Sequence, residues 1–212
     1  MNRFVILLIF AFAPLAGRAD PATILVFGDS ISAGYGLPSV ARGWVALLQT
    51  KLDKAGYGYH VVNASVSGET TAGGLARLPR ALGLHHPQIV ILELGGNDGL
   101  RALPVADMRA NLAAMVRLAK DSGAAVLLLG IRIPPNYGPD YTEQFFNSYA
   151  ILGKELRVPV VPFLLDGIAL SPELMQADGI HPNEQGQGKL VANVWTALQP
   201  LLVNSSGAAH PK

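Results

Sequence analysis

The chain has 212 residues, of which 50% are hydrophobic and 15% are charged, and its formal net charge is +1 at pH 7. This balance excludes an intrinsically disordered chain and offers no basic patch for binding nucleic acid. Because the sequence contains no cysteine, disulfide bonds, a thiolate metal site, a cysteine nucleophile and a lipidated cysteine anchor are excluded as well.

The start of the chain has the order typical of a secretory signal peptide. Arg3 precedes an apolar stretch at 4–13, and the small residues Gly17 and Ala19 follow. The apolar stretch is short for a transmembrane helix. We therefore expect a signal peptide at 1–19 and a periplasmic or secreted protein without stable membrane insertion after cleavage. An uncleaved membrane anchor is the alternative.

Short apolar runs follow, and they alternate with helix-like segments. Continuous apolar runs of this kind suit parallel strands that are buried on both faces. The runs lie at 24–27, 61–62, 89–92 and 126–129. A fifth candidate strand at 160–161 is flanked by Pro159 and Pro162, which favours a position at the edge of the sheet.

Apolar residues recur at helical spacing in the segments 44–52, 108–119 and 190–198. Strands that alternate with helices imply βαβ units, and these predict an α/β fold with a three-layer α/β/α sandwich around a parallel sheet. We expect one domain at 20–203 and a flexible C-terminal tail at 204–212. No long apolar stripe demands a partner subunit, so we expect a monomer.

Residues that could carry chemistry gather in four short segments, which follow predicted strands or lie late in the chain. The segments are GDSISAG (28–34), NASVSGET (63–70), GGND (95–98) and DGIHPN (178–183). A Pro/Gly-rich stretch at 131–141 follows the fourth predicted strand. Because ligands bind beyond the carboxyl ends of strands in an open parallel sheet, this stretch could form part of a site. A mere connector is the alternative.

Ser30, His181 and Asp178 have the residue types that acyl transfer by a serine requires. A serine hydroxyl becomes a good nucleophile only when a base accepts its proton, and imidazole titrates near working pH. Asp178 lies three residues before His181, so its carboxylate can accept the Nδ1 proton and hold Nε2 toward Ser30. We expect these three residues to be catalytic.

An oxyanion hole also needs hydrogen-bond donors, and three candidates are available. Ser30 can offer its own backbone N–H at the start of a helix. Gly68 can offer an N–H that no side chain hinders, and Asn97 can offer its side-chain amide.

Each of these pieces also has a simpler interpretation. Gly-Asp-Ser and Gly-Asn-Asp are turn sequences, and Asp178 could be only a cap or an Asx turn. His85 and His86 precede Pro87 and have no ligand cluster around them, so we expect an exposed connection and no metal site.

Three further acids are not expected to take part in catalysis. Asp29 and Asp98 are interpreted as residues that stabilise their own turns. Glu93 interrupts an apolar strand, and a buried glutamate needs a partner or a raised pKa. We expect an arginine, either Arg77 or Arg132, to pair with it.

The four segments together resemble the SGNH hydrolases, also called GDSL esterases, and in particular the bacterial group of thioesterase I, protease I, lysophospholipase and arylesterase. The likeness covers nearly the whole mature chain, and the four blocks of the family are present as Gly28-Asp29-Ser30, Gly68, Gly95–Asp98 and Asp178–His181. The resemblance implies a flavodoxin-like sheet of five parallel strands in the order 2-1-3-4-5. It also implies a serine hydrolase that needs no metal or other cofactor.

The same resemblance implies acyl thioesters, aryl esters and lysophospholipids as small-molecule substrates. The walls of an acyl pocket are then expected after Asn97 and in the stretch 131–141, which gives a list of candidate substrate-binding residues: Gly99, Leu100, Pro104, Pro135 and Tyr137. Two alternatives remain open. One is a carbohydrate O-deacetylase, which the low aromatic content of 7% disfavours, and the other is a non-catalytic module that binds acyl ligands.

Overall fold

A computed structural model describes residues 21–202 of the chain. The signal peptide expected at 1–19 and the tail expected at 204–212 therefore lie outside the described residues. One sheet of five parallel strands has the order β2-β1-β3-β4-β5. The strands are β1 (Ala22–Gly28), β2 (Tyr59–Asn63), β3 (Ile89–Glu93), β4 (Ala125–Leu129) and β5 (Val160–Val161). The predicted fold class and strand order are confirmed, and β5 takes the edge position that its flanking prolines favour.

Strands β1 and β3 form the centre of the sheet. Leu25 of β1 pairs with Val62 on one side and Val90 on the other, and all three are apolar because helices cover both faces. Leu25 is fully buried and Val90 nearly so. Burial of such side chains is the main force that holds the sheet in place.

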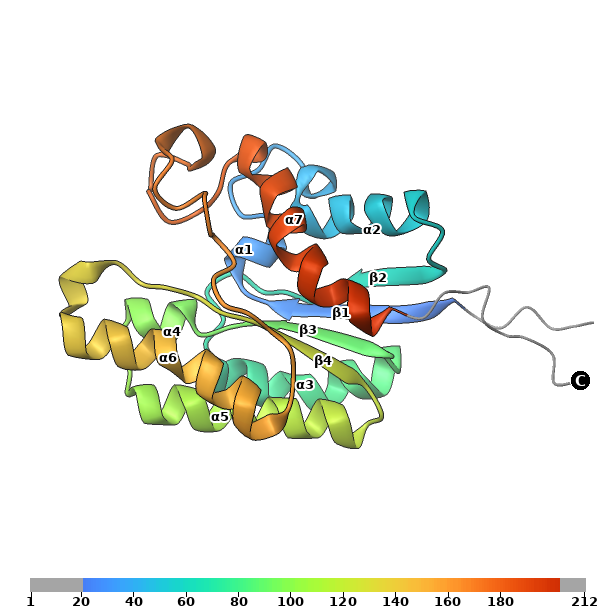
Figure 1. The fold of residues 1–212 in the computed structure, drawn as a ribbon, viewed down its shortest axis with the longest axis horizontal. Helices are drawn as coiled ribbons and strands as arrows, with labels where there is room; N and C mark the ends of the chain where they lie inside the picture. Colours follow the sequence, from blue (N-terminus) through green and yellow to red (C-terminus); the bar gives the residue numbers. More distant parts are fainter. Residues whose placement is uncertain (1–20, 203–212) are drawn as a thin grey trace, which may run out of the picture.

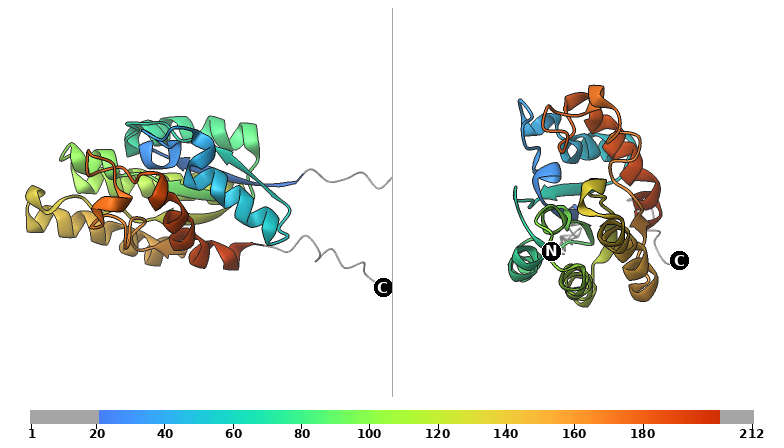
Figure 2. Two further views of the ribbon diagram at one scale, coloured as in Figure 1. Left: turned by 90° about the horizontal axis from the view of Figure 1, so that it is seen from above. Right: turned by 90° about the vertical axis from the view of Figure 1, so that its left-hand side faces the viewer.

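Seven α-helices surround the sheet within the described residues. They are α1 (Ser30–Ala33), α2 (Trp44–Lys54), α3 (Thr71–His85), α4 (Gly96–Leu100), α5 (Val105–Asp121), α6 (Pro139–Leu156) and α7 (Gln187–Leu198). Figure 1 and Figure 2 show α2 and α7 on one face of the sheet and α3, α5 and α6 on the other. The three-layer sandwich and the helices predicted in the segments 44–52, 108–119 and 190–198 are thus confirmed. Among residues 21–202, no helix is long and apolar enough to cross a membrane.

Two of the long helices, α3 and α6, were not predicted from the sequence. In α3, Gly73, Gly74 and Pro79 interrupt the pattern, and the helix persists because it packs against α5 and the sheet. Helix α6 starts inside the Pro/Gly-rich stretch 131–141, with Pro139 at its first position. Proline is tolerated there because the first N–H groups of a helix have no intrahelical partner. Only the part of the stretch before Pro139 is a connection.

The carboxyl ends of the strands meet at one edge of the molecule, at the left in Figure 1. The connections that follow β1, β3 and β4 leave from this edge, and the long segment between β5 and α7 returns beside it. Short 3-10 turns punctuate the connections. They are Val40–Arg42, Pro135–Tyr137, Pro172–Leu174, Glu184–Gly186 and Gln199–Leu201.

Candidate active site

Ser30 stands where β1 ends and the four-residue helix α1 begins. The side chain of Asp29 caps this helix by accepting a hydrogen bond from the N–H of Ile31 at 3.1 Å, as its turn-stabilising interpretation predicts. Ser30 is the first residue of α1, where backbone N–H groups have no intrahelical acceptor. Both its hydroxyl and its N–H are therefore presented at the carboxyl edge of the sheet.

His181 and Asp178 reach Ser30 from the segment between β5 and α7. The distance from His181 Nε2 to Ser30 Oγ is 2.8 Å, and the distance from His181 Nδ1 to Asp178 Oδ2 is 2.7 Å. An ionised carboxylate only accepts hydrogen bonds, so the Nδ1 atom donates to it. That tautomer leaves Nε2 as the acceptor for the Ser30 hydroxyl proton. The structure thus brings together the three residues that the sequence singled out.

Asp178 is held in its ionised form. Partial burial favours the neutral acid, but hydrogen bonds from the His181 N–H, the His181 ring and the Ile180 N–H outweigh it and lower the pKa of Asp178 to about 2. The two backbone N–H groups donate to Oδ1 at 2.9 and 3.0 Å. The other oxygen, Oδ2, is left to the imidazole.

The position of His181 is fixed from two directions. Its carbonyl accepts from the N–H of Gln176 at 2.8 Å, and the Gln176 side chain donates to the carbonyl of Tyr35 at 2.8 Å. The Tyr35 ring packs against the imidazole at a tilt of 44°, with 4.7 Å between the ring centroids. Gln176 therefore ties the histidine segment to the chain that follows Ser30.

Asn97 and Gly68 approach from two other elements. Asn97 is the second residue of α4, which begins three residues after β3 ends, and its Nδ2 donates to Asp29 Oδ2 at 3.1 Å. Gly68 lies on an exposed turn with φ at +79°, a conformation that favours glycine. The Arg101 side chain, at the end of α4, donates to the Gly68 carbonyl at 3.1 Å and links the two.

Glu93 does not have the arginine partner that the sequence suggested. Its Oε2 accepts from the Ser32 hydroxyl at 2.6 Å and from the Asp29 N–H at 3.2 Å. The Glu93 Oε1 atom has no hydrogen bond to any described residue. Burial, followed by the charge of Asp29, raises the pKa of Glu93 well above its usual range. The surroundings of Glu93 therefore favour its neutral form.

Both candidate arginines are engaged elsewhere, which corrects the expectation for Arg77 and Arg132. Arg77 pairs with Glu69 at 2.9 Å, and its guanidinium lies over the Phe27 ring at 4.2 Å from the centroid. Arg132 stacks on Phe146, with 3.7 Å between the guanidinium carbon and the ring centroid. A carboxyl group whose pKa is raised by burial has less need of a cation, and the sequence could not reveal that burial.

Asp98 forms hydrogen bonds outside its own turn, which its turn-stabilising interpretation does not predict. Its two oxygens accept from the N–H and the hydroxyl of Thr71, at 2.8 and 2.5 Å. Thr71 is the first residue of α3, so Asp98 fastens α4 to the start of that helix. Thr70 caps the same helix through the N–H of Gly73. The residue next to Asn97 is therefore buried and fixed in place.

A large cavity of about 1360 Å³ opens at Ser30, Asn97 and His181. Among the five candidate substrate-binding residues, Leu100 and Pro135 line this cavity. Gly99 and Tyr137 lie behind the wall, since Gly99 packs closely against Ile133 and Phe145 and the Tyr137 hydroxyl donates to the Leu100 carbonyl at 2.8 Å. Pro104 is exposed at the start of α5 and does not line the cavity.

Sequence reasoning missed the cavity wall formed by the segment after β5. Phe163, Leu165, Ala169, Leu170 and Ile180 line the cavity from this side, and Leu170 is 97% exposed. A signal was present, because 163–170 follows the fifth predicted strand and ligands bind beyond the carboxyl ends of parallel strands. Because the fifth strand has only two residues, the sequence offered little reason to consider the segment that follows it.

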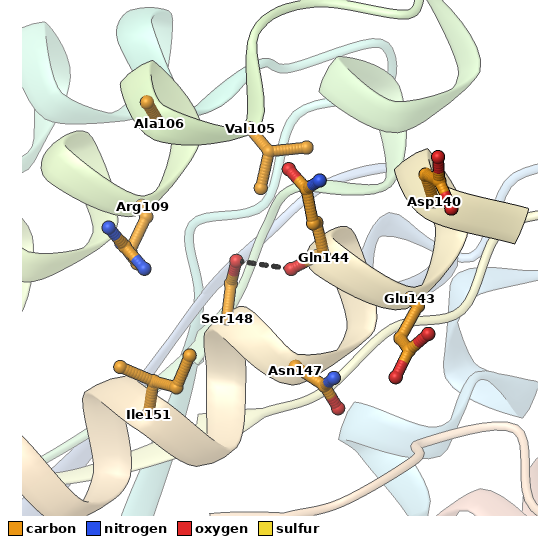
Figure 3. A pocket seen from close by; sticks show the side chains of 9 residues that line it. All are labelled: Val105, Ala106, Arg109, Asp140, Glu143, Gln144, Asn147, Ser148 and Ile151. Carbon is orange, nitrogen blue, oxygen red and sulfur yellow. Dashed lines mark hydrogen bonds between the residues drawn. The ribbon is translucent and has the colours of Figure 1, made fainter.

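A second, smaller hollow of about 370 Å³ lies between α5 and α6 (Figure 3). It shares only Glu143 with the larger cavity. The Ser148 hydroxyl on its wall donates to the Gln144 carbonyl at 2.8 Å, and no histidine lines it. This hollow therefore lacks the base that a nucleophilic serine requires.

Neither of the paired histidines is part of the cavity. His85 is the last residue of α3 and is half-buried, so the exposed connection expected for both histidines is wrong for His85; His86 is exposed and has a left-handed backbone with φ at +41°. Within residues 21–202, no three histidine, aspartate or glutamate side chains gather in a way that could hold a metal ion.

The sequence matches a known family over most of its length. The profile of the GDSL-like Lipase/Acylhydrolase family covers residues 26–189. The chain is similar to esterase TesA of Pseudomonas aeruginosa, with 52% identity over 91% of this chain and 95% of the relative. It is also similar to thioesterase 1/protease 1/lysophospholipase L1 of Escherichia coli K12, with 43% identity over 96% of this chain and 93% of the relative.

The fold has a close counterpart among solved structures. The crystal structure of TesA has 53% sequence identity and a TM-score of 0.83, covering 85% of this chain and 99% of the other. The likeness thus extends from the sequence to the arrangement of the sheet and its helices.

Proposed function

This chain belongs to the GDSL-like lipase/acylhydrolase family and is an ester hydrolase, and we propose that it works as an exported serine esterase and thioesterase through an acyl-enzyme on Ser30. The observation that carries this proposal is the unbroken chain of hydrogen bonds from Ser30 through His181 to Asp178, at 2.8 and 2.7 Å. That geometry is what activation of a serine hydroxyl requires.

The proposed reaction has two halves. In the first, Ser30 Oγ attacks the carbonyl carbon of the substrate while its proton passes to His181 Nε2. The imidazolium then gives this proton to the leaving oxygen or sulfur, and an acyl-enzyme remains. In the second half, water attacks the acyl-enzyme with His181 again accepting a proton, which returns to Ser30 Oγ as the carboxylic acid leaves.

The negative charge that develops on the carbonyl oxygen needs donors. The proposed oxyanion hole consists of the Ser30 N–H, the Gly68 N–H and the Asn97 Nδ2 group. The turn that carries Gly68 lies beside the end of β1, because the Val66 N–H donates to the Gly28 carbonyl at 3.0 Å. Loss of one such donor typically lowers kcat by about 10²–10³-fold.

The cavity favours an apolar acyl chain as the part of the substrate that is recognised. Ile131, Ile133 and Phe146 line one side of it, and the segment after β5 lines the other. We propose that Leu100 and Pro135 contact the acyl chain, whereas Tyr137 supports Leu100 through its hydrogen bond. The printed names of the relatives, which include thioesterase and lysophospholipase, agree with acyl thioesters and lysophospholipids as substrate classes.

Export and domain organisation are further parts of the proposal. The segment 1–19 has the composition of a signal peptide, so the mature protein is proposed to be a periplasmic or secreted monomer with one domain at 20–203. Cell fractionation and N-terminal sequencing test this part. Recovery of uncleaved chain in the membrane fraction would contradict it, and light scattering would reveal an oligomer.

The decisive experiment is hydrolysis of p-nitrophenyl esters from acetyl to palmitoyl by purified protein and by Ser30→Ala. We expect the variant to lose at least about 10³-fold in kcat while retaining its unfolding midpoint. The acyl-chain length that is hydrolysed fastest then indicates how long a chain the cavity accommodates. Activity on acetyl esters of sugars alone would favour a carbohydrate deacetylase, and the absence of turnover by folded protein would favour a binding module.

A further inference from the structure

Two buried carboxyl groups lie directly beneath Ser30, and neither takes part in the proton transfers of the proposed reaction. Asp29 is 2% exposed and Glu93 is fully buried. Within the described residues, neither forms an ion pair with a lysine or an arginine. Burial of a carboxyl group without a cation is costly, which points to a function for this pair.

Asp29 connects the nucleophile to the proposed oxyanion hole. Its Oδ1 accepts from the Ile31 N–H in α1, and its Oδ2 accepts from Asn97 Nδ2 in α4, both at 3.1 Å. An asparagine amide can present either its oxygen or its nitrogen to a neighbour. A carboxylate can only accept, so it selects the orientation in which Nδ2 faces Asp29. The second N–H of the same nitrogen is then free to donate inside the cavity that Asn97 lines.

The close approach of these groups depends on glycines. A Cβ atom at Gly96, the residue before Asn97, would stand 3.2 Å from Asp29 Oδ2. A Cβ atom at Gly28 would stand 2.5 Å from Glu93 Oε2, which is too close for any side chain. Glu93 in turn accepts from the Asp29 N–H and holds that residue from below. The backbone around Asp29 is therefore shaped to bring its carboxylate to Asn97.

We propose that Asp29 is a positioning residue for ester hydrolysis: its carboxylate fixes the Asn97 amide so that Nδ2 donates to the oxyanion formed at Ser30. The inference rests on the proposed function, because it assumes that Asn97 is an oxyanion donor. Asp29 acts through Asn97 and has no contact with the reacting atoms in this role.

The variant Asp29→Asn tests the proposal with little change in shape. One atom of the new amide still accepts from the Ile31 N–H, while the other becomes an N–H donor that faces Asn97. Because two donors cannot pair, the Asn97 amide turns and its N–H is lost to the oxyanion. We expect kcat to fall roughly 10–100-fold with little change in KM, since only a transition-state interaction is removed.

A double-mutant cycle separates positioning from a purely structural role. If Asp29 acts through Asn97, then Asp29→Asn in an Asn97→Ala background lowers kcat by less than about twofold further. Losses that multiply across the two sites would overturn the inference. Glu93→Gln is the matched control, because it changes the neighbouring buried carboxyl, which does not contact Asn97, while the new amide oxygen can still accept from the Asp29 N–H. We expect less than about a threefold change in kcat. A loss as large as that of Asp29→Asn that persists in the Asn97→Ala background would also overturn the inference.

The outcomes distinguish this inference from the function on which it rests. Wild-type protein without Ser30-dependent turnover would overturn the proposed function and the inference together. Ser30-dependent turnover combined with independent losses at positions 29 and 97 would overturn the inference alone. If Asp29→Asn fails to fold, Asp29→Ser replaces it in the cycle, because the single serine oxygen can still accept from the Ile31 N–H while the second oxygen, which faces Asn97, is removed.

Discussion

Two aspartates flank the Ser30–His181 pair, and their surroundings shift their pKa values in opposite directions. Asp178 is partly exposed and accepts three hydrogen bonds, which lower its pKa to about 2. Asp29 is buried, and burial raises its pKa to about 6 although the Ile31 N–H and the charge of His181 oppose the rise. The same residue type is thus strongly acidic on one side of the site and weakly acidic on the other.

The difference shows which physical effect dominates on each side. Around Asp178, donors are plentiful and water screens the charge, so ionisation stabilises the fold. Around Asp29, loss of water outweighs the two donors, so ionisation near pH 7 opposes folding. A charge kept in such a place despite its cost to stability is a mark of a functional constraint.

The largest expected effect comes from removing the charge on the exposed side. In Asp178→Asn, the new amide donates to His181 Nδ1 and so places the ring proton on Nε2. Nε2 can then no longer accept the proton of Ser30, and we expect kcat to fall roughly 10³–10⁴-fold. Steady-state hydrolysis of p-nitrophenyl esters measures this loss, and circular dichroism checks the fold. A rate close to that of the wild type would show that Asp178 is only a turn residue.

The pH dependence of stability should have opposite signs for the two aspartates. The unfolded pKa of aspartate is about 4. For Asp29, the folded chain binds the proton more tightly, so stability is present below about pH 4 and is lost as pH rises through about 6. For Asp178, stability is present above about pH 4 and is lost as pH falls through about 2.

Urea unfolding of wild type and Asp29→Asn from about pH 4 to about pH 8 tests this sign. Relative to the wild type, the variant should gain stability with rising pH, by an amount of the order of 1–3 kcal/mol. Glu93, His181 and Tyr149 also face Asp29 and remain in the variant. The difference therefore reports the loss of the Asp29 charge together with the lower pKa that this loss gives Glu93. Parallel pH profiles would contradict the assignment of a raised pKa to Asp29.

The two sides also differ in how much of them the sequence could predict. The exposed side could be predicted, because Asp178 and His181 lie three residues apart and their chemistry follows from residue type alone. The strand order came from the family resemblance, and the strands themselves came from apolar runs such as the one at 24–27. These features are local, or they depend on patterns that the chain repeats.

The buried side could not be predicted, because its contacts join residues that are distant in sequence. Asp29 meets Asn97 across 68 positions, and Ser32 meets Glu93 across 61. The raised pKa of Glu93 follows from burial, which only the packed structure defines. Asp98 was assigned to its own turn for the same reason, since its partner Thr71 is a residue of another helix.

The smallest expected effect concerns a tether at the surface on the exposed side. Arg42 and Glu184 form an ion pair with 2.6 Å between Nη1 and Oε2, and it joins the turn after α1 to the turn after His181. Both side chains are about half exposed, so water and salt screen the pair. We expect Arg42→Met and Glu184→Gln to change kcat/KM by less than about twofold, with any change vanishing at high salt. A larger loss that persists in salt would mean that the hydrogen bonds of Gln176 do not suffice to hold His181 against Ser30.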